Sequence, residues 1–518
     1  MTAPANAAAP AADGFPRAER ADIGLLLEGT FPYVAGGVSS WVNQIIRGFP
    51  DLTFAIAFIG SRREDYGTMK YALPPNVVHF ETHYLFERPR VPVVRPLPAD
   101  PGISEQVGRM HDYFRAPNSH AADAGVFAQL VPELCPGGRL DHDRFLYSVS
   151  SWDYIRDSYR RFCTDPSFID YFWTVRTMHA PVWVLAEIAE AFIPVRAYHT
   201  VSTGYAGLLG ALLKQRRGRP LVLSEHGIYT KERKIDLFQA DWVKDNRNVF
   251  QKDPAEIAYF RRMWIRFFEA LGRMCYDASD HITALYETNR LRQITDGADA
   301  ARTRNVPNGV NVARFAPLRS TRPREIPPVL CLIGRVVPIK DIKTFVRAMR
   351  IVANRLPEAE GWIAGPEDED PGYAQECREL AANLGIADKV KFLGFQQMTE
   401  LLPKVGVGVL SSISEALPLV VLEGYAAGVP AVCTDVGSCR QLIYGLPGED
   451  EALGASGRIV RIADPDGLAT AAIELLTQPE AWHAASAAGI ARVERYYTQD
   501  LMFGAYREIY DAALKAGG

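Results

Sequence analysis

Two similar strand–loop–helix starts lie about 300 residues apart in the chain. Residues 23–27 form a short apolar run typical of a buried strand, followed by a glycine-bearing loop (29–37) and a helical pattern. Residues 329–333 repeat this plan, with a loop at 334–340 and a helix that opens at Asp341. Apolar runs and helical patterns alternate over most of the chain, which predicts parallel sheets with helices on both faces. The two starts predict two Rossmann-like halves rather than one extended sheet.

The length also favours two large domains, because 518 residues exceed what one hydrophobic core usually supports. We predict a disordered tail at 1–18, which lacks the basic and Leu-rich regions of a signal peptide. The first domain is expected at 19–304, completed by a C-terminal helix at 496–518, and the second at 305–495. Residues 84–180 carry aromatic side chains at helical spacing and predict a mostly helical insertion in the first domain. Core packing is the favoured role of those aromatic residues, and a partner or acceptor surface is the alternative.

Composition excludes several classes of protein. The net charge of -4 gives no sign of a nucleic-acid partner. The longest apolar run, 416–433, is interrupted by Glu423, glycines and prolines and is shorter than the roughly 20 residues of a membrane helix. We therefore expect a cytoplasmic protein, and docking at the inner membrane through partner proteins stays compatible with this composition.

One short apolar helix is predicted at 418–427. Pro418 suits a first helical turn, Gly428 suits a left-handed cap, and Pro430 prevents continuation. Glu415 lies just before this helix and Glu423 lies two turns along it. The unpaired N–H groups and the positive dipole end of the helix suit a diphosphate, while Glu423 is within reach of a ribose. The segment therefore predicts a binding site for a sugar nucleotide.

An E-x7-E spacing is common, so this interpretation depends on the residues around it. Apolar residues, among them Leu419 and Val420, surround Glu423 and indicate a buried setting, and a buried carboxylate needs partners. A ribose diol would serve Glu423, and a hexose hydroxyl or the wall of the cleft would serve Glu415. Leu417, Leu419 and Val420, at the start of the helix, are predicted to contact the donor as well.

Two cations follow the strand at 329–333. The dinucleotide fingerprint and the P-loop are both missing, which disfavours dehydrogenases and kinases. Gly334, Arg335 and Lys340 instead follow the strand end, where ligands bind in open α/β sheets. Arg335 and Lys340 can neutralise a diphosphate and stabilise the charge that grows on it as a leaving group. Alone they would be typical of a solvated loop, but the helix downstream favours the site.

The first half contributes two glycines and two histidines to the prediction. Gly36 and Gly37 precede the first helix and permit close approach of a substrate, although a simple turn explains them equally well. His199 and His226 each follow a predicted strand and are expected to face the same crevice. A structural hydrogen-bonding role is the alternative for each. We predict a catalytic role for His226 and donor binding for His199.

Acidic D-x-D triplets, which could hold a metal, occur at 141–143, 368–370 and 464–466. Each lies beside proline, glycine or charge and is interpreted as a solvated turn. We accordingly predict no metal and no cofactor besides the donor substrate. A metal-dependent transferase that uses one of these triplets is the alternative.

Several motifs resemble a known family. The sequences GRVVPIKD, VKFLGF, SISEALPLVVLEGYAAGVPAVCTDVG and PNGVNVARF resemble the C-terminal half of retaining GT-B glycosyltransferases of family 4. In the first half, LLLEGTFPYVAGGVSSWV, YHTVSTGYAG and LSEHGIYTKER resemble the cytoplasmic glycosyltransferase of Pel-type exopolysaccharide systems. The resemblance implies an α/β GT-B fold with two facing Rossmann-like domains, the second holding most of the donor.

The resemblance also implies roles for particular residues. It assigns Arg335 and Lys340 to the diphosphate, Glu423 to the ribose and Glu415 to the donor hexose. Two glycines (36 and 37) would approach the donor from the first domain, and the histidine at 226 would lie near the sugar.

The implied reaction is transfer of a hexose from a UDP-sugar, with retention and without a metal, to a glycan acceptor. For this chain that acceptor would be a growing exopolysaccharide, made beside an inner-membrane polysaccharide synthase complex. A non-catalytic UDP-sugar-binding subunit of such a complex is the alternative, and UDP binding without UDP release would favour it. A glycoside phosphorylase on the same fold would need inorganic phosphate.

Overall fold

The computed structural model describes residues 14–87, 97, 101–115, 124–248, 252 and 256–518. The chain divides into two compact units. Unit 1 comprises Met1–Asn305 and Tyr506–Gly518, and unit 2 comprises Val306–Ala505. The C-terminal segment, expected to join the first domain from residue 496, joins unit 1 only from Tyr506.

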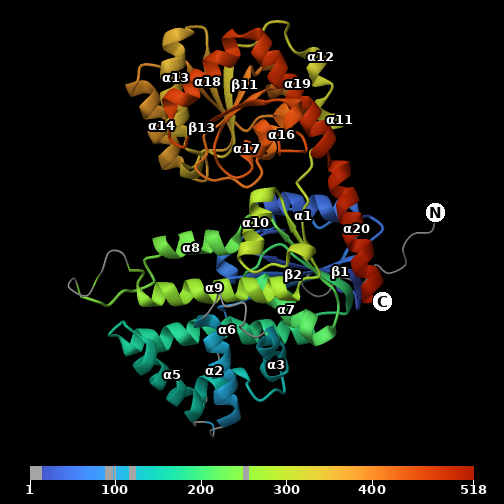
Figure 1. The fold of residues 1–518 in the computed structure, drawn as a ribbon, viewed down its shortest axis with the longest axis vertical. Coiled ribbons are helices and arrows are strands. Elements are labelled where there is room, and N and C mark those ends of the chain that lie inside the picture. Colours follow the sequence, from blue (N-terminus) through green and yellow to red (C-terminus); the bar gives the residue numbers. More distant parts are fainter. Residues whose placement is uncertain (1–13, 88–96, 98–100, 116–123, 249–251, 253–255) are drawn as a thin grey trace. The chain divides into compact units, whose positions relative to one another are not determined.

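Unit 1 contains a seven-stranded sheet in the order β3-β2-β1-β4-β5-β6-β7 (Figure 1). Every pair of neighbouring strands is parallel. All residues of β2 are buried, as expected for a central strand covered on both faces. The strand order reverses between β1 and β4, the topological switch point where ligands bind in such sheets. The strands are β1 (Ala21–Glu28), β2 (Phe54–Gly60), β3 (Val77–Tyr84), β4 (Val195–Thr200), β5 (Leu221–Glu225), β6 (His281–Ala284) and β7 (Thr303–Asn305).

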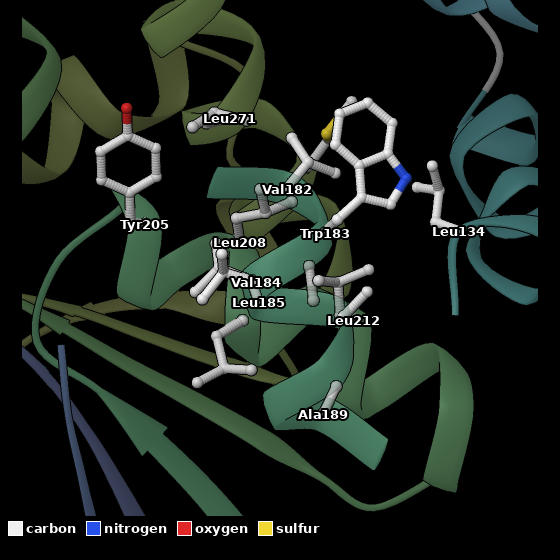
Figure 2. Close-up of a cluster of buried hydrophobic side chains, with 14 of the residues drawn as sticks. Leu134, Val182, Trp183, Val184, Leu185, Ala189, Tyr205, Leu208, Leu212 and Leu271 are labelled. Carbon is white, nitrogen blue, oxygen red and sulfur yellow. The ribbon is translucent and has the colours of Figure 1, made fainter. Parts of the chain in front are cut away.

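Most of the rest of unit 1 is helical. Helices α2 to α6 lie in the region of the predicted insertion. Within that region, residues 88–96, 98–100 and 116–123 lie outside the described residues. The main core lies where α6, α7 and α9 pack together; Figure 2 shows Val182 and Leu185 beside Leu208 and Leu212. The helices are α1 (Gly37–Gly48), α2 (Pro101–Arg115), α3 (Ala124–Leu134), α4 (His142–Tyr147), α5 (Val149–Phe162), α6 (Phe168–Ala191), α7 (Tyr205–Arg217), α8 (Tyr229–Gln239), α9 (Tyr259–Ala278) and α10 (Glu287–Thr295), with short 3-10 turns η1 (Arg63–Asp65) and η3 (Ala300–Arg302).

Two predicted boundaries in unit 1 are wrong. The insertion was expected to end at residue 180, but its last helix, α6, continues through Pro181 to Ala191, because the apolar residues after the proline pack into the core. The predicted tail also reaches too far. Residues 1–13 lie outside the described residues, but Phe15 packs on Phe80 with ring centroids 4.9 Å apart, and Pro16 accepts a backbone hydrogen bond. The end of that segment is therefore part of the fold.

Unit 2 contains six parallel strands in the order β10-β9-β8-β11-β12-β13. These six strands follow the same spatial order as the first six strands of unit 1. The switch point of unit 2 therefore lies between β8 and β11. Helix α13 packs on α14 and α18, while α16 packs on α19 (Figure 1). The strands are β8 (Val329–Ile333), β9 (Glu360–Ala364), β10 (Val390–Gly394), β11 (Val407–Leu410), β12 (Ala431–Thr434) and β13 (Gly457–Val460).

The helices of unit 2 follow the strands as a Rossmann-like fold requires. They are α11 (Val312–Phe315), α12 (Leu318–Thr321), α13 (Ile342–Arg355), α14 (Pro371–Asn383), α15 (Met398–Leu401), α16 (Leu419–Ala426), α17 (Cys439–Tyr444), α18 (Pro465–Thr477), α19 (Pro479–Tyr496) and the first part of α20 (Gln499–Gly517), with 3-10 turns η4 (Pro338–Lys340), η5 (Leu402–Lys404) and η6 (Glu451–Leu453). The predicted class, two α/β domains built on parallel sheets, is confirmed. Among the described residues, no helix is both long and apolar enough to span a membrane.

Candidate functional site

The loop after β8 is held in place by a close contact between two glycines. Gly334 has φ +156°, a backbone conformation that other residues rarely adopt. A Cβ atom on Gly365, in the loop after β9, would lie 1.9 Å from the carbonyl oxygen of Gly334. Gly334 is thus required by its backbone conformation, and Gly365 by the packing of the two strand ends. This packing fixes the start of the loop that carries Arg335 and Lys340.

Lys340 and Glu415 meet at the switch point of unit 2. The Lys340 Nζ atom lies 2.5 Å from Glu415 Oε1, and the Ser412 hydroxyl donates to the same oxygen at 2.6 Å. The Ser411 hydroxyl donates to the Lys340 carbonyl oxygen at 2.8 Å, which ties the loop after β11 to the loop after β8. The Lys340 and Glu415 side chains are 21% and 14% exposed, so the pair is shielded but still open to a ligand.

Arg335 pairs with a different carboxylate. Its guanidinium lies 2.5–2.6 Å from the two Glu369 oxygens, and both side chains are about half exposed. Such a surface pair contributes only about 0–1 kcal/mol, so an incoming anion can displace Glu369 at little cost. Each of the two predicted cations, Arg335 and Lys340, therefore pairs with one carboxylate.

Helix α16 presents its N-terminus without a competing acid. The helix covers Leu419–Ala426, slightly shorter than predicted, and begins after Pro418 as N-cap. No side chain caps it and no acidic residue lies in its first turn. The first N–H groups of a helix have no partner within it, so those of Leu419 and Val420 can bind an anion. Leu417 is buried just before this turn.

Glu423 lies half-buried on α16. Burial raises the pKa of its carboxyl group, and the charge of Arg314 opposes that rise. Within the part of the chain that the structure describes, the Glu423 carboxylate has no hydrogen bond or ion pair, which leaves it free to accept hydrogen bonds from a ligand. Gly428, with φ +79°, ends the helix in the left-handed conformation that the sequence predicts.

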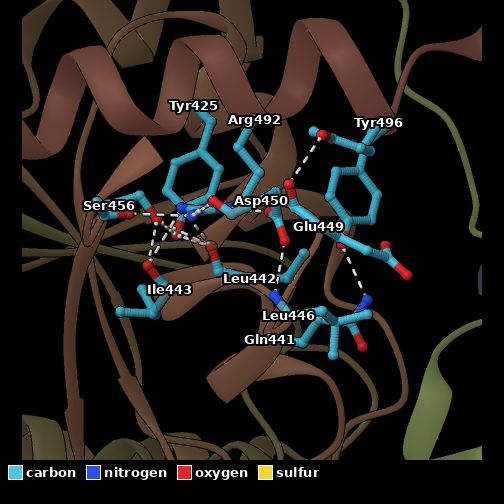
Figure 3. A network of polar contacts seen from close by, with 12 residues as sticks. Tyr425, Gln441, Leu442, Ile443, Leu446, Glu449, Asp450, Ser456, Arg492 and Tyr496 are labelled. Carbon is cyan, nitrogen blue, oxygen red and sulfur yellow. Dashed lines mark hydrogen bonds and ion pairs between the residues drawn. The ribbon is translucent and has the colours of Figure 1, made fainter. Parts of the chain in front are cut away.

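A buried polar network includes Tyr425 of α16 (Figure 3). Arg492 is fully buried and pairs with Asp450 at 2.5 Å. Its remaining N–H groups donate to four backbone carbonyls, so the whole guanidinium is satisfied. The Ser456 hydroxyl hydrogen-bonds to the Tyr425 hydroxyl of α16 at 2.7 Å and to the Leu442 carbonyl, which Arg492 shares. The network thereby links α16 to α17 and to the loop before β13.

In unit 1, the two predicted glycines lie at the start of α1. Gly36 is the N-cap and Gly37 the first helical residue, and both are exposed. A Cβ atom at either position would meet nothing within 4 Å, and the φ of 168° at Gly36 is open to any residue. The packing of unit 1 does not require glycine here, so a requirement for it would have to come from a ligand.

His226 follows β5 and has unused hydrogen-bonding capacity. It is 7% exposed and lies edge-on to Trp41 of α1, with ring centroids 4.5 Å apart. Neither ring nitrogen has a hydrogen-bond partner among the described residues. Burial lowers the pKa of His226 to about 4, although the nearby backbone of Ser224 raises it slightly. The ring is therefore neutral at pH 7 and could donate or accept a hydrogen bond.

His199 occupies a different environment. It is fully buried, its Nδ1 atom lies 2.8 Å from the Tyr510 hydroxyl, and its Nε2 atom lies 2.8 Å from the Ser224 hydroxyl. Both nitrogens thus serve the fold, since they tie β4 to β5 and to helix α20. This arrangement matches the structural alternative for His199, and the predicted contact with a donor gains no support from it.

The residue before His226 is a buried acid that sequence reasoning missed. Glu225 accepts hydrogen bonds from Thr203, Tyr229, Tyr276 and Gln293. Burial raises the pKa of Glu225 to about 7 in spite of these donors. Trp41 and Ser412 were missed as well. Ser412, two residues after the end of a predicted strand, could have been found by the strand-end rule, whereas Trp41 gives no signal of its contact with His226.

The three D-x-D triplets lie at the starts of helices. Asp141, Asp370 and Asp464 are the N-caps of α4, α14 and α18, and each accepts a hydrogen bond from the backbone N–H three residues on. Capping of this kind stabilises a helix by about 1 kcal/mol. Capping accounts for one aspartate of each triplet. Roles in turns and helix caps are therefore sufficient to explain these motifs.

Comparisons with known proteins agree with this geometry. The chain belongs to the family described as "Domain of unknown function (DUF3492)", whose model matches residues 21–301, more than half of the chain. A second model, "Glycosyl transferases group 1", matches residues 327–478, which include Arg335, Lys340, Glu415 and Glu423. This second match covers most of unit 2.

Several curated proteins are similar to the chain. A D-inositol 3-phosphate glycosyltransferase of Catenulispora acidiphila is 30% identical over 53% of this chain and 61% of its own length. The corresponding enzyme of Streptomyces griseus is 29% identical over 61% and 67%. A phosphatidyl-myo-inositol mannosyltransferase of Mycolicibacterium smegmatis is 32% identical over 39% and 49%. The chain thus matches about half to two thirds of the length of these relatives.

Solved structures support the fold. Sucrose-phosphate synthase from Thermosynechococcus elongatus superimposes with a TM-score of 0.55 at 16% identity, covering 96% of this chain and 100% of that one. HepE from Anabaena in complex with UDP superimposes with a TM-score of 0.54 at 13% identity, covering 95% and 100%. At these identities the likeness establishes the GT-B type of fold.

Proposed function

We propose that the protein is a retaining glycosyltransferase that moves a hexose from a UDP-sugar to a glycan acceptor without a metal ion. One observation carries the proposal. Two cations and an uncapped helix N-terminus converge on the switch point of unit 2, within the group 1 glycosyltransferase match. This is a site for a group with two phosphates, because cations and free N–H groups stabilise phosphate charge together.

In the proposed mechanism, the donor diphosphate takes Lys340 away from Glu415 and Arg335 away from Glu369. Each cation then stabilises the negative charge that develops on the β-phosphate. This charge develops as the bond between the anomeric carbon and the phosphate oxygen breaks. Glu415, released from Lys340 but still held by Ser412, accepts hydrogen bonds from the hexose hydroxyls. Glu423 accepts hydrogen bonds from the ribose hydroxyls. These hydroxyls supply the partners that its carboxylate does not have among the described residues.

The acceptor oxygen forms the new bond on the same face of the sugar, and its proton passes to the departing phosphate oxygen. In this scheme His226 is neutral and binds a sugar hydroxyl rather than acting as a charged acid, since burial holds its pKa near 4. The family resemblance assigns Gly36 and Gly37 of unit 1 to donor binding as well. Similar proteins solved with UDP bound, such as HepE from Anabaena, support a uridine nucleotide as the donor part.

For the acceptor, we propose a growing exopolysaccharide of the Pel type. The motifs of the first half resemble PelF, the cytoplasmic glycosyltransferase of that system, and this resemblance supports the assignment. Partner proteins of an inner-membrane polysaccharide synthase would then bring the acceptor to the enzyme.

The leaving-group role of Lys340 is testable by kinetics. Lys340→Ala should lower kcat about 100-fold or more at saturating donor, because the variant lacks an interaction made in the transition state. The matched control is Lys343→Ala, three residues on, whose ammonium pairs with the exposed Glu376 and should be dispensable. UDP release from UDP-glucose, UDP-galactose and their N-acetyl forms measures turnover. Normal kcat in Lys340→Ala would refute the role.

A binding subunit without turnover is the competing function, because both cations are neutralised in the free protein. Thermal-shift assays with UDP-, GDP- and ADP-sugars, with and without EDTA, separate the two. Stabilisation by UDP-sugars together with UDP release favours the enzyme, since a bound donor stabilises the native state by mass action. Stabilisation without release from any donor and acceptor favours the binding subunit, and loss of activity in EDTA favours a metal-dependent enzyme.

A further inference from the structure

A cavity of about 180 Å³ lies in the helical part of unit 1, among α2, α5, α6 and α9. None of the residues assigned above to donor binding or catalysis lines it. Most of its wall is aromatic or aliphatic, including Phe114, Tyr171, Met178 and Phe267. A wall of this kind binds the apolar part of a small molecule, and a few polar groups would fix its orientation.

Two stacked histidines supply polar groups in this wall. His179 is 1% exposed, and its Nδ1 atom lies 2.7 Å from the Val175 carbonyl oxygen. A carbonyl oxygen only accepts, so Nδ1 carries the proton and Nε2 is a bare acceptor. This Nε2 atom is buried without a partner among the described residues, as is His111 Nε2. The two rings stack at 7°, with centroids 4.7 Å apart.

Both histidines are uncharged at neutral pH. Burial lowers the pKa of His179 to about 4. Burial and the neighbouring His179 ring lower the pKa of His111 well below its usual value. A buried acceptor without a partner is unfavourable, and native proteins rarely keep one unless water, an ion or a ligand satisfies it. A hydroxyl or N–H group in the cavity would satisfy His179 Nε2.

Arginines line the same cavity. Arg262 and Arg266 lie one turn apart on α9, and within the described part of the chain neither has an acidic group at ion-pair distance. Arg115 is a third, but it pairs with Asp112 at 2.6 Å and stacks on Phe162 at 3.8 Å. Two guanidinium groups without an acidic partner beside an apolar cavity favour an anion. The same charges disfavour a metal ion between the histidines.

We propose that this cavity binds a small amphiphilic anion: an aromatic ring or short acyl chain that bears a carboxylate or phosphate. The apolar body packs against Phe114 and Phe267, the anionic group binds Arg262 and Arg266, and a hydroxyl or N–H of the ligand donates to His179 Nε2. The site is separate from the donor site and does not depend on the proposed transferase activity.

Isothermal titration calorimetry on the full chain tests the site with phenyl phosphate and sodium octanoate as probes. Both should bind saturably with one site per chain, while inorganic phosphate and 1-octanol, which each lack one half of the chemistry, should bind at least tenfold more weakly. Arg262→Gln with Arg266→Gln should weaken the probes tenfold or more, because removal of each charge-assisted hydrogen bond lowers affinity about tenfold. Arg160→Gln, on the exposed face of α5 and outside the cavity, is the matched control.

A second variant keeps the test independent of charge. Met178→Trp fills the cavity and should abolish binding of both probes, and circular dichroism confirms that each variant folds. Vesicles of phosphatidylglycerol distinguish a lipid from a free small molecule. If the wild-type chain pellets with the vesicles and the arginine variant does not, the ligand is a lipid chain. If the probes bind but the chain does not pellet, the ligand is a free small molecule. Absence of saturable probe binding, or equal affinity in the arginine variant, would overturn the proposal.

Discussion

The two units share one strand order but treat the switch point in opposite ways. In unit 1 the carboxylate of Glu28, at the end of β1, accepts a hydrogen bond from the Ala206 N–H in the first turn of α7 at 3.1 Å. Tyr229 also donates to Glu28, at 2.9 Å. In unit 2 the corresponding strand, β8, is followed by Arg335 and Lys340, and α16 has no acid in its first turn.

This difference decides which unit can hold phosphate. A helix N-terminus attracts an anion through its free N–H groups and its dipole. Unit 1 satisfies that attraction with its own side chain, which would also repel a phosphate. Unit 2 leaves the helix end open and adds cations. Equal topology therefore gives one unit with an open helix end, where we propose that the diphosphate binds, and one in which the Glu28 carboxylate already occupies the helix end.

The units also bury charge differently next to these sites. Glu225 in unit 1 is surrounded by uncharged donors, and its pKa is accordingly raised to about 7. Arg492 in unit 2 has a carboxylate partner, Asp450, and five hydrogen bonds. Removal of a partner should therefore matter most in unit 2, and a change of pH most in unit 1.

The largest effect is expected from Arg492→Met. The substitution leaves Asp450 buried without its partner and should lower the free energy of unfolding of unit 2 by about 3–5 kcal/mol. Urea denaturation followed by circular dichroism measures it. The control is Arg495→Met, at an exposed position about one turn after Arg492 on α19. This substitution should change stability by less than about 0.5 kcal/mol. A similar loss of stability in both variants would mean that the buried network has no special role.

A smaller effect concerns pH. Because the pKa of Glu225 is raised in the folded state, the folded chain binds more protons than the unfolded chain between about pH 4.5 and 7. The stability contributed by this group is present below that window and is lost as pH rises through about 7, by up to about 3 kcal/mol.

Glu225→Gln should remove this loss. The difference between the unfolding free energies of wild type and variant, measured in urea at pH 5 and pH 8, isolates Glu225, because the buried histidines contribute equally to both. Glu379→Gln, an exposed acid on α14, should leave the profile unchanged. The same pH dependence in wild type and Glu225→Gln would show that Glu225 ionises normally.

The smallest effect tests the comparison of the switch points directly. Glu423→Gln should weaken UDP binding about tenfold, because the variant lacks hydrogen bonds to an ionised acceptor. Glu28→Gln should leave UDP affinity within twofold. Binding to wild type should also weaken as pH falls towards the raised pKa of Glu423. Calorimetry with UDP measures all three, and an equally weakened affinity in Glu28→Gln would contradict the assignment of UDP to unit 2.

Much of the fold was predictable because it depends on local patterns. Apolar runs and the glycines and prolines between them located β1, β8 and α16 to within a few residues. The ends of α6 and of the N-terminal segment were not predictable in this way. Pro181 lies inside a helix, and residues before 19 pack on β3, because distant side chains outweigh the local preference.

By itself, the sequence determined the alternation of strands and helices, the division into two α/β units and the residues that follow each strand, since these depend on hydrophobic periodicity and chain connectivity. Only the tertiary structure decided how those residues are paired. It joined Lys340 to Glu415 across 75 positions, gave both nitrogens of His199 to Ser224 and Tyr510, and left His226 without a partner among the described residues. Pairing of side chains far apart in the chain depends on strand order and packing, which no local pattern records.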